Sequence, residues 1–382
     1  MKRRALWALL AVFALVVAAC GDGDAADTTE AAPATTEAPA AGTTTEAPAA
    51  TTTTIDPKAD WPESIIFGFV PSQEQEQLSD DIQPFVDVLT EALGIEVEGV
   101  VTTDYTGLVT AMGTGQADFG AFGPFGYVLA EQQFSNLEVL IQSIRRGAAT
   151  YHGQWFTNDA SLCDSDPAPG AFENEPLGDP DATPVLKAPT DVLAQQTGYD
   201  YPSGEDPVRT EGVSEGYACE GIDFTDLAGM TVAWTTETST SGYVFPALQL
   251  INAGLDVETD ITSIFTGGHD GAVTAVLNGD ADVGVSFDDA RGILEETNPD
   301  VGEKVIVFNL TSEIPNDVVA VRGELPDSLK AAVYVAIETY LATDEGKAVF
   351  DEIYEWTDIR PANDADFDVV RDAAVKLGIT EP

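Results

Sequence analysis

The stretch that decides the fold is residues 235–250, TTETSTSGYVFPALQL. An apolar run, residues 230–234, precedes it and predicts a buried strand. Behind the Ser- and Thr-rich part, apolar residues recur at the spacing of one helical face: Val244, Ala247, Leu248 and Ile251. The sequence therefore predicts a strand followed by a helix, with Ser239, Thr240 and Ser241 at or just before the helix N-terminus.

A helix N-terminus presents free backbone N–H groups and a partial positive charge. Hydroxyl side chains at residues 239–241 would add neutral donors beside those groups, which makes this stretch a candidate site for a small tetrahedral oxyanion. The alternative is an ordinary Ser/Thr helix cap. Taken alone, the stretch fits both interpretations.

Composition limits how such an anion could be held. The 382 residues allow two domains of ordinary size, and a hydrophobic fraction of 44% is enough for real cores. The chain has 16 Lys and Arg against 66 Asp and Glu, a net charge of -50. This balance excludes binding of nucleic acid or an anionic membrane through a basic patch. We therefore expect a bound anion to be held by neutral donors, helix ends and a histidine.

The N-terminal residues predict export. Residues 2–4 are basic and residues 5–16 are apolar, as in a signal peptide that would span residues 1–19. Residues 17–20, VAAC, resemble a bacterial lipobox, in which the chain is cut before Cys20 and a lipid is attached to that cysteine. The alternative is a simple secretory signal with a cysteine there by chance.

A tether is expected next. Residues 20–60 repeat Thr, Ala, Pro and Glu with few large apolar side chains, which predicts a disordered segment. No later apolar run is long enough to cross a bilayer. We expect a globule outside the cytoplasmic membrane, periplasmic or on the cell surface, that touches the membrane only through a lipid on Cys20.

Two cysteines remain in the globular part, Cys163 and Cys219. Outside the cytoplasm, two thiols favour a structural disulfide over a reactive pair. The bond would close a loop-rich, acidic segment, residues 158–221, which we interpret as an insertion. No metal site and no nucleotide-binding loop emerge from the sequence, so we expect no cofactor.

Strand and helix patterns alternate along the globular part. Residues 65–70 predict a strand, residues 82–93 an amphipathic helix that ends at Gly94, and residues 95–101 a second strand. This alternation predicts an α/β fold with a largely parallel sheet. Two helical regions are expected to close the first lobe near the C-terminus: residues 327–356 and 362–377.

A fifteen-residue pattern occurs twice. Residues 106–120, TGLVTAMGTGQADFG, align without a gap on residues 270–284, DGAVTAVLNGDADVG, and eight positions are identical. Each copy predicts a short helix, a Gly turn and a strand that begins Ala-Asp, which indicates two similar lobes whether or not the copies share an ancestor. Tyr105 and His269 directly precede the two copies, so both would project from equivalent helix ends towards a cleft between the lobes.

Several motifs together resemble the phosphonate/phosphite-type periplasmic substrate-binding proteins of ABC transporters. In chain order they are Ser239-Thr240-Ser241-Gly242, Gly268-His269, the segment 282–289 and Pro315-Asn316-Asp317. The resemblance implies a two-lobed periplasmic-binding-protein fold of type II, in which two crossing strands join lobes that close on a ligand. We expect residues 61–150 plus 316–382 to form lobe 1, and residues 151–315 to form lobe 2.

The resemblance also implies which residues hold the ligand. The positions that match the family's phosphonate-binding residues are Ser239, Thr240, Ser241, Tyr105, Tyr151 and His269. In the aminoalkylphosphonate binders, acidic residues hold the ligand's amino group. Asp289 and Asp317 stand at such positions here, and the adjacent Asp288 could substitute for Asp289.

The predicted function is therefore capture of a small phosphonate-like anion, with an aminoalkylphosphonate favoured, and its delivery to an ABC permease in the membrane. We expect a monomer that binds no nucleic acid. The alternatives are a binder of phosphite, phosphate or a sulfonate, a sensor on the same fold, and a hydrolase that uses His269. Nothing resembles a nucleophile elbow, so we do not expect an enzyme.

Overall fold

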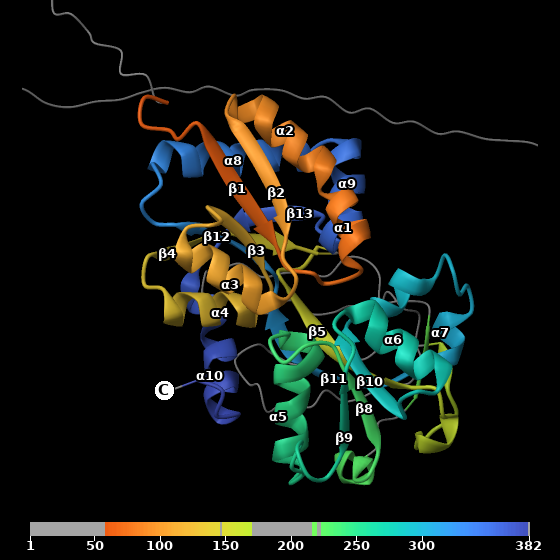
Figure 1. Cartoon of the computed structure of the whole chain (residues 1–382). Helices are drawn as coiled ribbons and strands as arrows, with labels where there is room; N and C mark the ends of the chain where they lie inside the picture. Colours follow the sequence, from red (N-terminus) through yellow and green to blue (C-terminus); the bar gives the residue numbers. More distant parts are fainter. Residues whose placement is uncertain (1–57, 146, 170–215, 220–222, 381–382) are drawn as a thin grey trace, which may run out of the picture. The chain divides into compact units, whose positions relative to one another are not determined.

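The structure is a computed structural model that describes residues 58–145, 147–169, 216–219 and 223–380. Their strands form two separate sheets, with helices on both faces of each (Figure 1). None of the helices in these ranges combines the length and apolar composition that a bilayer crossing needs.

Several sequence-based predictions lie outside the described residues. They concern the signal peptide, the lipid-bearing Cys20, nearly all of the tether and the middle of the insertion.

The two sheets contain most of the regular backbone structure. Sheet 1 has the spatial order β13 (Asp358–Pro361), β4 (Leu137–Ile144), β12 (Val318–Arg322), β3 (Phe119–Phe122), β1 (Ser64–Phe69) and β2 (Glu96–Val101). Sheet 2 has the order β6 (Ala168–Pro169), β7 (Tyr217–Ala218), β11 (Ile306–Pro315), β5 (Thr150–Thr157), β10 (Val283–Phe287), β8 (Thr231–Trp234) and β9 (Thr262–Phe265).

The sheets are mixed, which corrects the prediction of a largely parallel sheet. β1 pairs parallel with β2 and β3, and β8 pairs parallel with β9 and β10, as repeated strand–helix units require. The strands that carry the chain between the sheets run the other way: β5 is antiparallel to β10 and β11, and β12 is antiparallel to β3 and β4.

The helices follow the predicted apolar periodicity in most places. They are α1 (Gln75–Asp81), α2 (Gln83–Leu93), α3 (Tyr105–Thr114), α4 (Pro124–Gln133), α5 (Phe245–Asn252), α6 (His269–Asn278), α7 (Val301–Lys304), α8 (Asp327–Leu341), α9 (Asp344–Tyr354) and α10 (Asp368–Lys376). The predicted helix over 327–356 is two helices: α8 ends with Ala342 as its C-cap, and Thr343 caps α9, because its hydroxyl accepts from the Gly346 N–H. β13 was not predicted.

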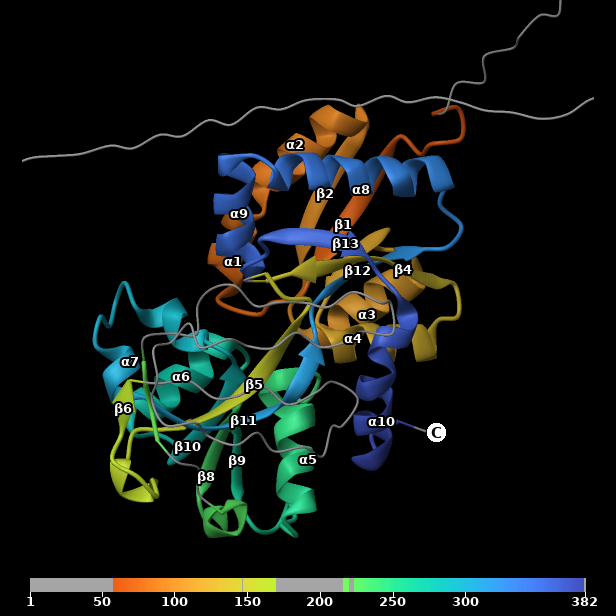
Figure 2. The same cartoon turned by 180° about the vertical axis from the view of Figure 1, so that it is seen from behind.

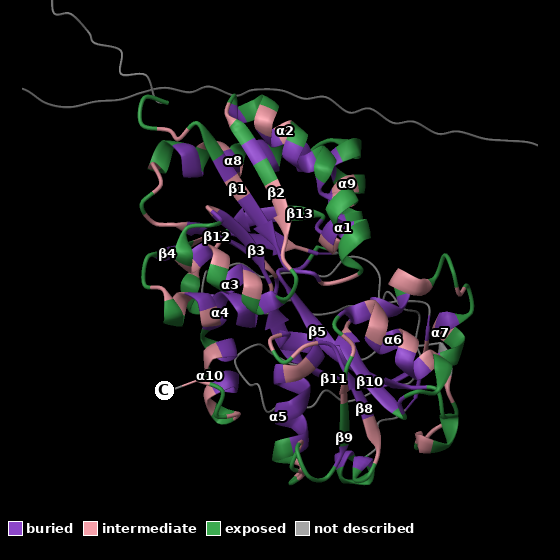
Figure 3. Ribbon diagram, viewed as in Figure 1, coloured by how far each residue is buried: buried purple, intermediate pink, exposed green. Residues whose placement is uncertain are grey.

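Aromatic packing holds one face of sheet 1. Phe67 and Phe69, two positions apart on β1, point to the same face of the sheet. The centres of their rings lie 5.3 and 6.1 Å from the centre of the Phe85 ring of α2. Phe350 of α9 closes the layer 5.1 Å from Phe85. Burying each such ring contributes about 2 kcal/mol, so this layer anchors the strand that leads into the site. Figure 3 shows the continuous buried interior.

The opposite face of sheet 1 shares its core with the second half of the chain. α10 contacts both α4 and α5, and it lies beside both helices in Figures 1 and 2. Val370 of α10 belongs to the same buried cluster as Phe125 of α4 and Phe245 of α5. The second of the two helical regions expected to close the first lobe, residues 362–377, thus packs its apolar side chains against elements next to both sheets.

The predicted internal repeat is present as two equivalent units, α3–β3 and α6–β10. Both helices end at a glycine in the left-handed region, Gly115 with φ 74° and Gly279 with φ 78°. The aspartate that precedes the strand has the same role in both units: its carboxylate accepts a hydrogen bond from a backbone N–H of a neighbouring strand. Asp118 accepts from the Ile66 N–H at 2.9 Å, and Asp282 accepts from the Thr231 N–H at 2.8 Å.

The chain crosses from sheet 1 to sheet 2 between β4 and β5, and returns between β11 and β12. Asn316 joins the two crossings: its side-chain amide donates to the carbonyls of Ser143 at 3.1 Å and Ala148 at 2.7 Å. The exact lobe boundaries, 61–150 plus 316–382 and 151–315, stay a prediction.

The predicted disulfide is present. Cys163 and Cys219 are bonded, and their Cα atoms are 5.7 Å apart. Cys219 directly follows the short strand β7, so the bond attaches the end of the insertion to sheet 2.

Candidate functional site

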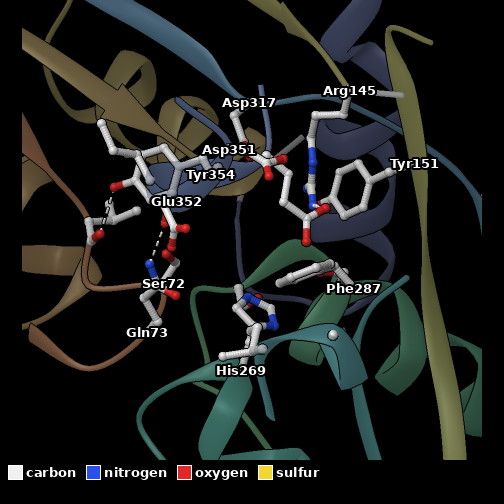
Figure 4. Close-up of a pocket in the computed structure, with 18 of the residues that line it drawn as sticks. Ser72, Gln73, Arg145, Tyr151, His269, Phe287, Asp317, Asp351, Glu352 and Tyr354 are labelled. Atoms are coloured by element: carbon white, nitrogen blue, oxygen red, sulfur yellow. Dashed lines mark hydrogen bonds and ion pairs between the residues drawn. The ribbon is translucent and has the colours of Figure 1, made fainter. Parts of the chain in front are cut away.

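A cavity of about 610 Å³ lies between the two sheets and receives side chains from both halves of the chain. Figure 4 shows Arg145 and Tyr151 side by side, with Phe287 and His269 pointing into the same space. Of the predicted ligand-binding residues, seven line this cavity: Tyr105, Tyr151, Ser239, Thr240, Ser241, His269 and Asp317. Their contact with a ligand stays a prediction.

The Ser/Thr stretch forms a π-helical turn, Thr240–Val244, directly before α5. Ser239 is its N-cap, and its hydroxyl accepts from the Gly242 N–H at 3.1 Å. A Cβ on Gly242 would lie 2.0 Å from the Thr235 hydroxyl oxygen, so this tight turn needs glycine there. The cap and the anion-site interpretations are thus compatible, because Ser239 caps the turn and lines the cavity.

Thr240 and Ser241 are almost completely buried and also line the cavity. The Thr240 hydroxyl accepts a hydrogen bond from the Phe125 N–H, at 2.9 Å, at the start of α4. A hydroxyl that accepts one bond still has its own proton to donate, and hydrogen bonding between Thr240 and the Tyr151 hydroxyl ties the turn to β5 as well. The contact with Phe125 links the anion turn directly to the helix next to sheet 1.

Tyr151, on β5, brings a further hydroxyl to this turn. Burial raises the pKa of Tyr151, and the charge of Asp317 raises it further, while hydrogen bonding to Ser241 and Thr240 opposes the rise. Tyr105, the first residue of α3, has its pKa raised by burial and then by Asp317. Both phenols therefore stay protonated at neutral pH and can donate hydrogen bonds.

His269 is the first residue of α6, as the repeat predicted. Its backbone N–H donates to the Ser72 carbonyl at 3.0 Å, and its Nδ1 lies 2.7 Å from the Ser286 hydroxyl. Burial, and then the positive charge of Arg145, lower the pKa of His269 to about 3. The imidazole is therefore neutral at pH 7 and donates one hydrogen bond from whichever ring nitrogen carries the proton.

Asp317 is the predicted carboxylate that does line the cavity. The Trp356 indole N–H reaches its Oδ2 at 3.4 Å. Burial raises the pKa of Asp317, while the nearby Arg145 opposes that rise. A carboxylate that is partly shielded from water would gain from a cation placed in the cavity.

Asp289 is buried and does not line the cavity, and its predicted contact with a ligand stays a prediction. Its carboxylate binds the Arg291 guanidinium at 2.6 Å and the Gln154 amide at 2.8 Å. Burial acts to raise the pKa of Asp289, but the charge and hydrogen bonds of Arg291 outweigh it and lower the pKa. Asp288 is buried as well, accepts from the His152 N–H at 3.3 Å and does not line the cavity either.

Sequence reasoning missed Arg145, which is buried, lines the cavity and forms an ion pair of 2.9 Å with Glu355. Its guanidinium lies 4.6 Å from the centre of the Phe287 ring and 5.4 Å from that of Tyr151. The expectation that only neutral donors and a histidine surround the anion is therefore incomplete. The available signal was a basic pair, residues 145–146, directly before the first crossing.

Carboxylates form much of the remaining lining. Within the described residues, Arg145 is the only Lys or Arg among the lining side chains. The acidic lining residues are Asp81, Glu296, Asp317, Asp351, Glu352 and Glu355. The described residues contain no group of three His, Cys, Asp or Glu side chains arranged to hold a metal ion.

The chain is similar in sequence to known substrate-binding proteins. Residues 67–367 match the family described as the periplasmic substrate-binding protein of a phosphonate ABC transporter. The chain is 26% identical over 333 residues to the phosphate-import protein PhnD of Mycolicibacterium smegmatis, covering 81% of this chain and 85% of that one. It is 20% identical over 314 residues to the phosphonates-binding periplasmic protein of Escherichia coli, covering 82% and 76%.

Two solved structures share the fold. The binding protein of an ABC phosphonate transporter from Pseudomonas aeruginosa aligns with a TM-score of 0.61 at 19% identity, covering 83% of this chain and 87% of that one. PhnD1 from Prochlorococcus marinus, in complex with methylphosphonate, aligns with a TM-score of 0.62 at 17% identity, covering 85% and 100%. The likeness confirms the predicted two-lobed α/β fold.

Proposed function

Because the chain belongs to the phosphonate-binding family of ABC transporter periplasmic substrate-binding proteins, we propose that it captures an aminoalkylphosphonate between its lobes. Members of this family are substrate-binding transport proteins rather than enzymes, and they work with a membrane permease. We propose no catalytic activity for this chain. The observation that carries the proposal is the convergence of uncharged O–H donors and carboxylates on one interlobe cavity.

The donors suit a phosphonate head group. Ser239, Thr240 and Ser241 lie at the N-terminal turn of a helix, where hydroxyl and backbone donors meet a favourable dipole. Tyr105 and Tyr151 stay protonated and add two donors without adding charge. Neutral donors bind an oxyanion without repelling a cationic group on the same ligand.

The acidic lining suits an ammonium group. Asp317 lines the same cavity as Tyr105 and Tyr151, and its charge raises the pKa of both. A zwitterion in this cavity could therefore meet hydroxyl donors and a carboxylate together. With Asp289 occupied by Arg291, Asp317 is the predicted carboxylate that remains for this role. An ammonium there would relieve its unfavourable burial.

A second candidate is an anion without an amine. It is favoured by Arg145, which supplies a positive charge to the cavity, and the relative from Mycolicibacterium smegmatis is named a phosphate-import protein. Phosphite, methylphosphonate, phosphate or a sulfonate would then leave Asp317 without a cationic partner.

Calorimetric titration of the purified full-length protein with 2-aminoethylphosphonate, methylphosphonate, phosphite and phosphate tests the proposal. We expect 2-aminoethylphosphonate to bind at least tenfold more tightly than the other three. Preference for phosphate or methylphosphonate would retain the oxyanion site and overturn the amine site. If none of the four compounds binds, the proposed ligand class is wrong.

We also propose that Cys20 carries a lipid that holds the protein at the outer face of the cytoplasmic membrane. Its support is the VAAC motif behind an apolar segment. The expected result is that the native chain fractionates with membranes and that a Cys20→Ser variant does not. Release of both into the soluble fraction would contradict the anchor.

A further inference from the structure

The Arg145–Glu355 ion pair is a feature of the cavity that the proposed function does not use. Arg145 lies just after β4, where the chain leaves sheet 1, and Glu355 lies just after α9. Both side chains line the cavity, and 8% and 23% of their surfaces are exposed. A charged pair this far from water interacts more strongly than a surface pair, and loss of either partner changes the local potential sharply.

Arg145 is held in one orientation. Its guanidinium pairs with Glu355 on the sheet 1 side, and it lies over the rings of Tyr151 and Phe287, which belong to strands of sheet 2. Figure 4 shows the long side chain of Arg145 extended into the pocket alongside Tyr151. The cation is thus placed beside the hydroxyl that meets Ser241 and Thr240.

Glu355 stands where the backbone favours glycine. Its φ is 57°, in the left-handed region, and among the described residues it is the only non-glycine with a positive φ. A side chain in this conformation is disfavoured relative to glycine. At the end of α9 a glycine would serve the backbone better, so the carboxylate itself is what the position supplies.

The charge of Arg145 reaches three of the predicted site residues. It lowers the pKa of His269 and opposes the burial that raises the pKa of Asp317 and of Tyr151. Glu355 acts in the opposite sense on Asp317. The pair therefore controls the potential that a ligand meets beside the Ser/Thr turn.

We propose that Arg145 binds the anionic head of the ligand and that Glu355, by sharing its guanidinium, sets the preference between anions with and without an ammonium group. This inference rests on the proposed function of the site, although it requires only that the site binds a small anion. With Glu355 in place, most of the positive charge of Arg145 is balanced, and an ammonium-bearing ligand is tolerated. Without that carboxylate, the same guanidinium would favour plain anions.

The test compares Arg145→Gln, Glu355→Gln and Glu355→Gly by calorimetry with 2-aminoethylphosphonate, methylphosphonate and phosphate. Arg145→Gln should weaken methylphosphonate and phosphate about 10- to 100-fold, the usual effect of losing a charged hydrogen-bond donor. Both Glu355 variants should lower the preference for 2-aminoethylphosphonate over methylphosphonate by about tenfold. Glu355→Gly suits the backbone, so it keeps the test valid if the Gln variant folds poorly.

The matched control is Arg371–Glu131, an Arg–Glu pair with the same 2.9 Å separation that does not line the cavity. Arg371→Gln and Glu131→Gln should leave the ratio of the affinities unchanged. Merely weaker folding would reduce all affinities together and leave that ratio intact.

This inference alone would be overturned if folded Arg145→Gln bound methylphosphonate and phosphate as tightly as the wild type. It would also be overturned if both Glu355 variants kept the wild-type ratio of the affinities for 2-aminoethylphosphonate and methylphosphonate. Preference of the wild type for phosphate would overturn only the amine proposal, because Arg145 can still be tested with phosphate. Failure of the wild type to bind any probe would overturn both.

Discussion

At the scale of single residues, the site depends on how burial changes the charge of a few side chains. Burial keeps Tyr105 and Tyr151 protonated, keeps His269 neutral and makes the ionised form of Asp317 costly. Donors for an oxyanion and a carboxylate for an amine can therefore share one cavity without a large net positive charge.

Asp317→Asn tests the role of that carboxylate. We expect it to weaken 2-aminoethylphosphonate about 10- to 100-fold, because the ammonium loses its charged partner. Methylphosphonate should bind as well or better, because the negative charge that repels it is gone. Calorimetry on both ligands checks this, and an equal loss for both would point to disturbed packing instead.

His269 predicts a pH dependence of stability. Its pKa is about 3 in the folded protein and about 6.5 when unfolded, so the unfolded chain binds the extra proton between these values. The contribution of His269 is thus fully present above about pH 6.5 and is lost as pH falls towards 3. A His269→Gln variant should lose less unfolding free energy than the wild type between pH 7 and pH 4, as measured by urea denaturation.

The difference between the two proteins should approach about 1.4 kcal/mol per pH unit within that window. Comparing them cancels the many carboxylates that both share. Parallel curves for the two proteins would show that His269 does not titrate as described.

At the scale of elements, the turn before α5 decides the site. A regular helix start would place residues 239–241 differently, whereas the π-helical turn Thr240–Val244 buries all three hydroxyl residues against the cavity. Thr235 lies directly under Gly242 and leaves no space for a side chain. The site thus depends on one close approach between a strand end and a helix start.

Gly242→Ala should therefore both destabilise the protein and weaken the ligand. The added methyl would lie within 2.8 Å of three Thr235 side-chain atoms, so the turn must shift, at a cost of about 1–3 kcal/mol. Thermal unfolding and calorimetry measure the two effects. Gly292→Ala is the stability control, because its methyl would meet nothing within 4 Å. Normal behaviour of Gly242→Ala would contradict the packing described.

At the scale of the whole molecule, the two halves are joined by more than the crossings. The Phe125 N–H binds Thr240, the His269 N–H binds the Ser72 carbonyl, and α10 packs between α4 and α5. The residues predicted to grip the ligand thus also connect the lobes. Two of the predicted ligand-binding residues, Thr240 and His269, therefore also make hydrogen bonds between the two halves of the chain.

The disulfide acts at this scale as well. The cysteines are 56 positions apart, so on a chain-entropy model their bond contributes about 4 kcal/mol to stability. A Cys163→Ser, Cys219→Ser double variant should unfold at a clearly lower temperature by calorimetry, while its ligand affinity stays unchanged because neither cysteine lines the cavity. Lost affinity in the folded variant would tie the insertion to the site.

The sequence by itself determined the repeated helix–strand units, the Ser/Thr turn, the disulfide partners and the family. These follow from local periodicity, from glycines at helix ends and from motifs whose residues are close along the chain. Tyr105 and His269 were identified in this way because they occupy the equivalent position directly before the two copies of the repeat.

Only the tertiary structure decided the charges around the cavity. Asp289 and Asp317 looked equivalent in sequence, but Arg291 binds one, and the other faces the cavity. Arg145 meets Glu355 across 210 positions, a pairing that no local pattern encodes. Charged side chains interact according to their distance in space and not along the chain. In this protein those interactions decide which carboxylate and which cation a ligand would meet.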